Sequence, residues 1–105
     1  MSGSRPVCVI TGAGTGIGRV LASTYADAGF AVVLAARRVE LLEQTAAVVR
    51  DAGGAASTFP CDVRAEDDCR RLMEAVMAEH GRVDVLLNNA AVPGKDQRVA
   101  DMDLA

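Results

Sequence analysis

Four short apolar runs, separated by segments of helical period, constrain the fold of this 105-residue chain most strongly. Most of the runs are continuous rather than alternating, which is typical of strands buried on both faces of a parallel sheet. They cover residues 7–10, 31–35, 55–59 and 83–87, of which 55–59 is the weaker because it contains Ser57 and Thr58. Parallel strands are joined by right-handed crossovers, which place helices on both faces of the sheet. The pattern predicts an α/β fold with a doubly wound parallel sheet and the order βαβαβαβ.

The segments between the runs predict three helices, over about 17–28, 39–52 and 65–80. Gly29 and Gly81 follow two of them, at the position where a left-handed residue ends a helix. In the first helix, spacing of i, i+3 and i+4 predicts one core-facing stripe. Its members are Ile17, Val20, Leu21, Thr24, Tyr25 and Ala28. We therefore expect Tyr25 to be a packing residue.

A glycine-rich turn joins the first strand to the first helix. It reads Thr11-Gly12-Ala13-Gly14-Thr15-Gly16-Ile17-Gly18. Glycines let the backbone turn tightly and approach a ligand closely, and the N–H groups at a helix start bind phosphate oxygens. The G-x-G-x-x-G spacing fails, because Ile17 stands where its third glycine belongs, and no Gly-Lys-Ser/Thr follows as a P-loop requires. The turn predicts a diphosphate site of another spacing.

That spacing, T-G-x-x-x-G-x-G, resembles the short-chain dehydrogenase/reductase family. The resemblance implies a Rossmann-type fold, of which this chain would be the first half and the cofactor-binding portion. It also implies a nicotinamide dinucleotide as ligand. Contacts to that ligand are expected from Gly12, Thr15, Gly16 and Ile17.

The end of the second strand bears on which dinucleotide is bound. An acidic residue there would hold the adenosine ribose hydroxyls of NAD, but the position is Ala36, followed by Arg37 and Arg38. A small neutral residue beside a guanidinium admits a 2′-phosphate and pairs with it. We expect NADP as the preferred cofactor, with Arg37 as the main contact and NAD as the other candidate. In the alternative interpretation both arginines merely flank a helix start in solvent.

Two further segments match the family at strand ends. Asp62 and Val63 follow the third strand, and the resemblance implies that they meet the adenine; alternatively, Asp62 caps the third helix. The fourth strand ends at Asn88, Asn89 and Ala90, similar to the family's N-N-A-G segment, although Ala91 replaces the glycine. By resemblance, Asn88 stabilises the central sheet, while Asn89 and Ala90 lie along the cofactor ribose.

The family's proton-transfer residues have no match in the sequence. The family uses Tyr-x-x-x-Lys with a nearby Ser. The one tyrosine of this chain, Tyr25, is followed four residues on by Gly29, and its one lysine is Lys95. We therefore expect no catalytic residue here, and expect those residues beyond residue 105. Residues 1–105 are interpreted as a single, truncated dinucleotide-binding domain that is inactive alone, with 93–105 as a loop leading to a missing helix. We also expect the apolar fourth run to leave an open sheet edge that favours self-association.

Composition excludes several other classes of function. The net charge is −3, with no basic stripe for nucleic acid. The longest uncharged apolar run, 30–36, is far too short to span a bilayer, and 1–6 holds no apolar targeting core. Three cysteines without CxxC spacing suggest reduced packing residues rather than a metal site. We expect a cytoplasmic protein with no membrane or nucleic-acid partner and no bound metal.

The sequence thus predicts an oxidoreductase that transfers hydride between nicotinamide and a carbonyl or alcohol carbon of a small molecule, homo-oligomeric when complete. One alternative is a non-catalytic dinucleotide-binding module. Another is a methyltransferase-like domain that binds S-adenosylmethionine. Such a domain has an acidic residue two positions before the first glycine, where this chain has Ile10.

Overall fold

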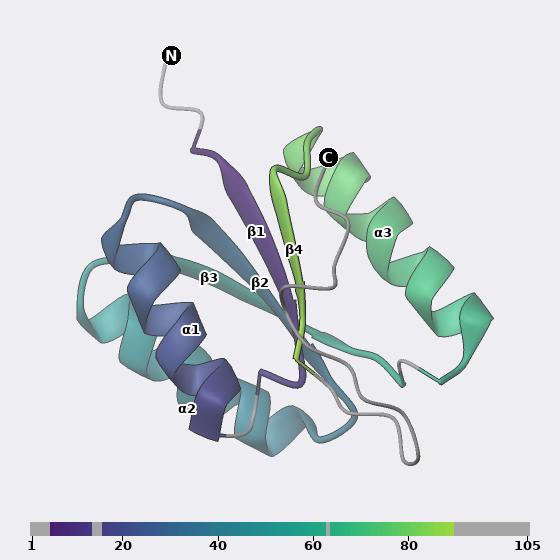
Figure 1. The fold of residues 1–105 in the computed structure, drawn as a ribbon, viewed down its shortest axis with the longest axis horizontal. Coiled ribbons are helices and arrows are strands. Elements are labelled where there is room, and N and C mark those ends of the chain that lie inside the picture. The colour runs from purple at the N-terminus through teal and green to yellow at the C-terminus, as the bar shows by residue number, and fades with distance from the viewer. Residues whose placement is uncertain (1–4, 14–15, 63, 90–105) are drawn as a thin grey trace.

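The computed structural model describes residues 5–13, 16–62 and 64–89. Strands and helices alternate along this part of the chain, as the apolar runs predict (Figure 1). The elements are β1 (Val7–Thr11), α1 (Gly16–Asp27), β2 (Ala31–Ala36), α2 (Val39–Asp51), β3 (Ala55–Pro60), α3 (Glu66–His80) and β4 (Val85–Asn88). Most predicted boundaries lie within one residue of these. The predicted terminal loop, 93–105, lies outside the described residues.

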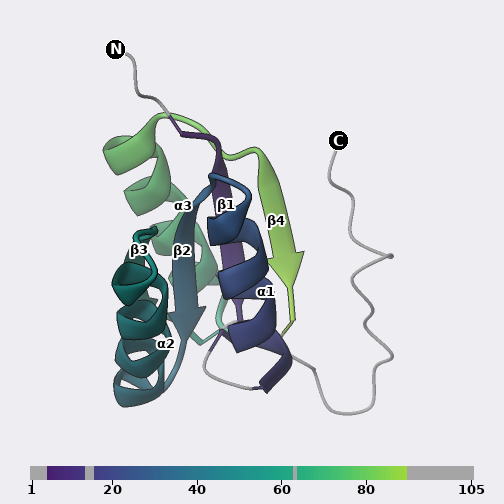
Figure 2. The ribbon, with the colours of Figure 1, turned by 90° about the vertical axis from the view of Figure 1, so that its left-hand side faces the viewer.

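The four strands form one parallel sheet in the order β3-β2-β1-β4. α1 and α2 cover one face and α3 covers the other (Figures 1 and 2). The predicted doubly wound α/β architecture is therefore confirmed. Among the described residues, β1 and β2 are the central strands, while β3 and β4 lie at the edges.

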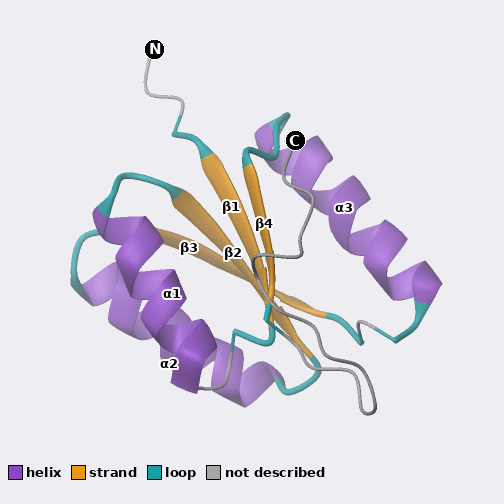
Figure 3. Ribbon diagram, viewed as in Figure 1, coloured by secondary structure: helices purple, strands orange, loops and turns teal. Residues whose placement is uncertain are grey.

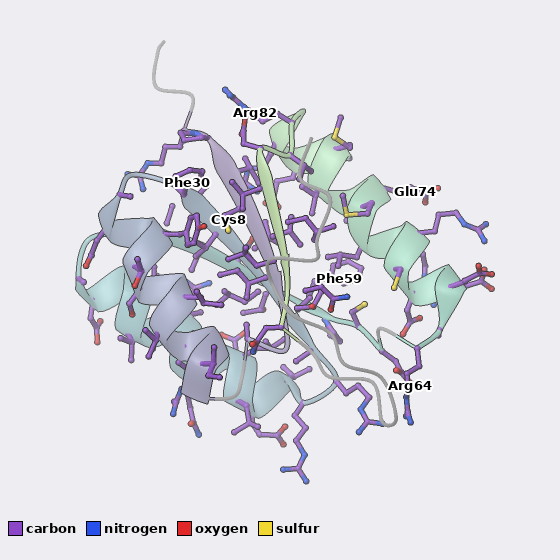
Figure 4. The ribbon with its side chains drawn as sticks, viewed as in Figure 1. Cys8, Phe30, Phe59, Arg64, Glu74 and Arg82 are labelled. Carbon is purple, nitrogen blue, oxygen red and sulfur yellow. The ribbon has the colours of Figure 1, made fainter. Side chains whose placement is uncertain are left out.

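The core has two parts because alternate residues of each strand face opposite sides of the sheet. Cys8 and Ile10 of β1 belong to the part beneath α1 and α2, whereas Val7 and Val9 belong to the part beneath α3. Figure 4 shows Cys8 in the interior of the molecule. All five residues of β1 are buried, so its continuous apolar run reflects cover on both faces.

The predicted core face of α1 is only partly correct, because Leu21 and Tyr25 contact the core and the other predicted members are exposed. Ile17 and Val20 are 68% and 65% exposed, and the buried residues of this helix are Gly18 and Ala22. Leu21, Tyr25 and Ala26 complete the contact with the core. The helix packs through its smallest residues because they allow its backbone to come close to the glycine-rich turn, and this rotates the large side chains outward.

The predicted ends of the helices are confirmed. Gly29 and Gly81 have φ of +98° and +74°, the left-handed conformation that glycine adopts without strain. Tyr25 of α1 packs edge-on against Phe30, with ring centroids 5.2 Å apart, which confirms its packing role. None of the helices in the described ranges is long and apolar enough to cross a membrane.

Candidate functional site

The predicted site residues that the structure describes lie at the carboxyl ends of the strands (Figure 3). Gly12 follows β1, Arg37 follows β2, Asp62 comes after β3, and Asn89 follows β4. From β1 the chain crosses to β2 on one side and later returns to β4 on the other, so the strand order reverses between β1 and β4. Open α/β sheets bind ligands in the crevice outside such a reversal.

The start of the glycine-rich turn is tied to both neighbouring strands. The N–H of Gly12 donates to the carbonyl of Ala35 at 2.8 Å, and the N–H of Ala13 donates to the same oxygen at 3.4 Å. The carbonyl of Gly12 accepts from Nδ2 of Asn89 at 3.2 Å. Gly12 has φ of +68°, which a residue with a side chain adopts only with strain. The backbone groups of Gly12 therefore serve to hold the turn in place.

Gly18 brings the first turn of α1 against that backbone. A Cβ at Gly18 would lie 2.4 Å from the carbonyl oxygen of Gly12 and 2.7 Å from Cα of Ala13, closer than real Cβ atoms come. At Gly16, by contrast, a Cβ would meet nothing within 4 Å. Gly16 and Ile17 are exposed. The N–H groups of a first helical turn have no intrahelical acceptor, so this exposed turn is suited to an anion.

Thr45 of α2 is a contact to the turn that sequence reasoning missed. Its side chain is only 1% exposed, and Oγ1 donates to the carbonyl of Ala13 at 3.1 Å. Nε of Arg19 in α1 donates to the same Oγ1 at 3.2 Å. The available signal was one polar residue at helical spacing within a buried stripe, three residues after Leu42 and four before Val49.

The two arginines after β2 are exposed. Arg38 is the N-cap residue of α2, but its side chain makes no capping bond. The guanidinium of Arg37 is close enough to Asp62 to contribute to lowering the pKa of that carboxyl group. The structure therefore brings Arg37 and Asp62, from the ends of adjacent strands, to the same side of the site.

Asp62 does not cap α3, whose N-cap is Ala65. Its Oδ1 accepts the backbone N–H of Arg64 at 3.0 Å and Nε of Arg64 at 3.3 Å. These bonds, the backbone one first, lower the pKa of Asp62. Its own N–H donates to Oδ2 of Asp68, in the first turn of α3, at 2.9 Å. The segment is thus fixed with an ionised carboxylate at the edge of the site, where Figure 4 shows Arg64.

The end of β4 is joined to the end of β1. Oγ1 of Thr11 donates to Oδ1 of Asn88 at 2.8 Å, in line with the sheet-stabilising role that the resemblance implies for Asn88. Asn89, one residue on, reaches Gly12 as described above. The three remaining predicted site residues, Thr15, Val63 and Ala90, lie outside the described residues.

The cysteines are packing residues. Cys8 and Cys61 are buried, and burial raises the pKa of Cys8 to about 12 and that of Cys61 to about 11, so both remain thiols at neutral pH. Within the described ranges, His, Cys, Asp and Glu side chains form no group able to hold a metal ion.

Comparison with known proteins is consistent with this geometry. The family model described as short chain dehydrogenase matches residues 6–105. A fatty acyl-CoA reductase of Acinetobacter baylyi is 44% identical over 84 residues, which are 80% of this chain and 28% of that protein.

Two solved structures share the fold. A metagenomic short-chain oxidoreductase in complex with NADP is 42% identical with a TM-score of 0.81, and the match covers 88% of this chain and 41% of that one. An NAD⁺-bound xylitol dehydrogenase is 36% identical with a TM-score of 0.80, covering 93% and 38%. The chain thus spans less than half the length of each of these relatives.

Proposed function

Since the chain belongs to the short-chain dehydrogenase family, we propose that it binds a nicotinamide dinucleotide, with NADP preferred, across the carboxyl ends of its strands. The observation that carries the proposal is the exposed first turn of α1, held against Gly12 and Ala13, whose backbone groups are hydrogen-bonded within the protein. The helix dipole and the first-turn N–H groups, which have no acceptor within the helix, attract the diphosphate.

Each predicted contact has a place in this proposal. The N–H groups of Gly16 and Ile17, with Thr15, bind the diphosphate, while Gly12 shapes the turn. Asp62 and Val63 meet the adenine, where the Asp62 carboxylate accepts from the exocyclic amine. Asn89 and Ala90 lie along the nicotinamide-side ribose.

The preference for NADP rests on the end of β2. Ala36 presents no carboxylate that would repel a 2′-phosphate, and the exposed guanidinium of Arg37, with Arg38 beside it, provides a charge-assisted partner. Arg37 lies near Asp62, the residue proposed to meet the adenine, and this supports a role for its charge on the adenosine side of the site. One relative above was solved with NADP and another with NAD⁺, so only the residues of this chain support the preference.

For the whole protein we propose an oxidoreductase, homo-oligomeric when complete, that acts on a small carbonyl compound or alcohol. The bound cofactor would supply or accept the hydride. This chain would bind and orient the cofactor, while the groups that move the substrate proton would come from a region that the longer relatives have and this chain does not cover. On its own the chain is expected to be inactive.

The test is titration of the 105-residue chain with NADP, NAD and S-adenosylmethionine. We expect NADP to bind most tightly, and Arg37→Ala to weaken NADP binding by about 10- to 100-fold, the effect of one charge-assisted hydrogen bond, with NAD binding unchanged. Arg50→Ala, at an exposed arginine near the other end of α2, is the matched control and is expected to leave both affinities unchanged. NAD binding at least as tight as NADP binding would contradict the preference, and tight S-adenosylmethionine binding would contradict the function.

A further inference from the structure

The buried hydroxyl of Thr45 connects three segments that lie apart in the sequence. It contacts Arg19 in α1 and Ala13 in the glycine-rich turn, 32 residues from Thr45. Ala13 is completely buried, so its carbonyl depends on a partner from within the protein. The role of this contact goes beyond the ligand-binding residues that the family resemblance implies.

The direction of the hydrogen bonds at Thr45 follows from their chemistry. A guanidinium only donates, so Oγ1 accepts from Nε of Arg19, and its single proton remains for a carbonyl. Two carbonyls are within reach, Ala13 at 3.1 Å and Leu41 at 3.3 Å. The carbonyl of Leu41 already accepts an N–H within α2, as in any helix of this pitch. The hydroxyl proton therefore goes to Ala13.

Arg19 holds this arrangement from α1. While Nε bonds Thr45, one terminal nitrogen of the guanidinium donates to Oε1 of Gln44 at 3.1 Å. These two bonds fix the guanidinium on α2 and restrict the rotation of the Thr45 hydroxyl. The start of α1, the turn and α2 are thus joined by a single chain of hydrogen bonds.

We propose that Thr45 is a positioning residue for the diphosphate part of the dinucleotide site, acting through the Ala13 carbonyl and oriented by Arg19. The inference rests on the proposed function. α2 begins directly after Arg37 and Arg38, so one helix holds the turn that shapes the diphosphate site and also carries the arginines of the 2′-phosphate site. Loss of the Thr45 hydroxyl leaves the buried carbonyl without its partner and disturbs only the diphosphate end.

The test compares two ligands on the 105-residue chain: NADP, which contains the diphosphate, and adenosine 2′-monophosphate, which lacks it. Thr45→Val is expected to weaken NADP binding about tenfold, as the loss of one buried hydrogen bond implies, and to leave the affinity for the monophosphate unchanged. Thr45→Ser, which keeps the hydroxyl, is expected to bind NADP like the wild type.

Arg19→Met is expected to weaken NADP binding about threefold without changing monophosphate binding, since the Thr45 hydroxyl remains but is less restricted. Because Arg19 is exposed, Arg19→Met should fold, and it can test the proposal if Thr45→Val does not fold. Thr58→Val is the matched control: its hydroxyl donates to Glu43 of α2 rather than to the turn, and both affinities should be unaffected.

Thr45→Val that binds NADP as the wild type does, or that loses both ligands equally, would overturn the positioning role and leave the proposed function intact. If Thr45→Val does not fold, an unchanged NADP affinity in Arg19→Met would also overturn the positioning role. A wild-type chain that binds no NADP overturns the proposed function itself, and the role of Thr45 with it.

Discussion

Both ends of β1 are hydrogen-bonded to the segment that contains β4, but by different means. At the amino end, the carboxylate of Asp84 accepts the N–H of Val7 at 2.7 Å. The guanidinium of Arg82 donates to the two oxygens of the same carboxylate, each at 2.8 Å. At the carboxyl end, Thr11 and Asn89 make neutral bonds to Asn88 and Gly12. Figure 4 shows Arg82 and Arg64 at these opposite ends.

The amino end of β1 therefore has its polar groups paired within the protein, whereas the carboxyl end lies beside groups that are exposed to a ligand. At the amino end, a full negative charge is matched by a guanidinium and a backbone N–H, which leaves little for a ligand to satisfy. At the carboxyl end, internal bonds occupy Gly12 and Ala13, while the helix start just beyond them is exposed. The contrast teaches that an open binding surface is set up by a closed layer of hydrogen bonds beneath it.

Of the substitutions considered, Gly18→Val should have the largest effect on stability and on NADP binding at the carboxyl end of β1. The new side chain would collide with the backbone of Gly12 and Ala13, which cannot move aside as a flexible side chain would. We expect a loss of about 2–3 kcal/mol in the free energy of unfolding, as for other overpacked sites, and at least about 100-fold weaker NADP binding. Thermal unfolding and titration measure the two effects. The stability control is Gly16→Ala, where a Cβ meets open space; equal destabilisation by both changes would contradict the close-packing argument.

Thr11→Val should weaken the same end by less. The substitution preserves shape but removes the donor to Oδ1 of Asn88, at a cost of about 1 kcal/mol in the free energy of unfolding. Chemical denaturation measures this cost. Thr24→Val, at an exposed position of α1, is the matched control and should change stability by less than about 0.5 kcal/mol. If the two variants proved equally stable, the link between Thr11 and Asn88 would have no energetic role.

Asp84→Asn should affect the amino end alone. Asparagine keeps an oxygen for the N–H of Val7 but loses the charge that faces Arg82, and exposed ion pairs contribute little. The melting temperature should fall by less than in Thr11→Val, and NADP affinity should not change. A clear loss of NADP affinity would show that the two ends are coupled, contrary to the comparison.

The smallest predicted effect is the loss of stability in acid, which should involve Asp84 at the amino end of β1. The Arg82 guanidinium, and next the N–H of Val7, lower the pKa of Asp84 below its ordinary value. The native state therefore favours the ionised form, and this stabilisation is complete above about pH 4 and is lost as pH falls through the lowered folded pKa. Denaturation curves of the wild type and Asp84→Asn should differ at neutral pH and converge in acid. A gap that widened in acid would contradict the assignment.

Much of the fold could be predicted because it depends on local pattern. Apolar runs located the strands, although the run of β3 is interrupted by Ser57 and Thr58. The glycines at 29 and 81 located two helix ends, because each adopts a left-handed conformation there. The placement of the predicted site at the strand ends followed from parallel topology. The rotation of α1 did not, because the helical spacing of Ile17 and Val20 suggested a core position although Gly18 makes the closest contact.

The sequence by itself determined the parallel α/β order, the glycine-rich turn and the arginines after β2, because hydrophobic period and glycine spacing act over a few residues. Only the tertiary structure decided which groups hold the turn: Ala35 of β2, Thr45 of α2 and Asn89 just after β4 all reach it. Hydrogen bonds between segments far apart in the chain depend on packing to within an ångström, and no local pattern of residues encodes that.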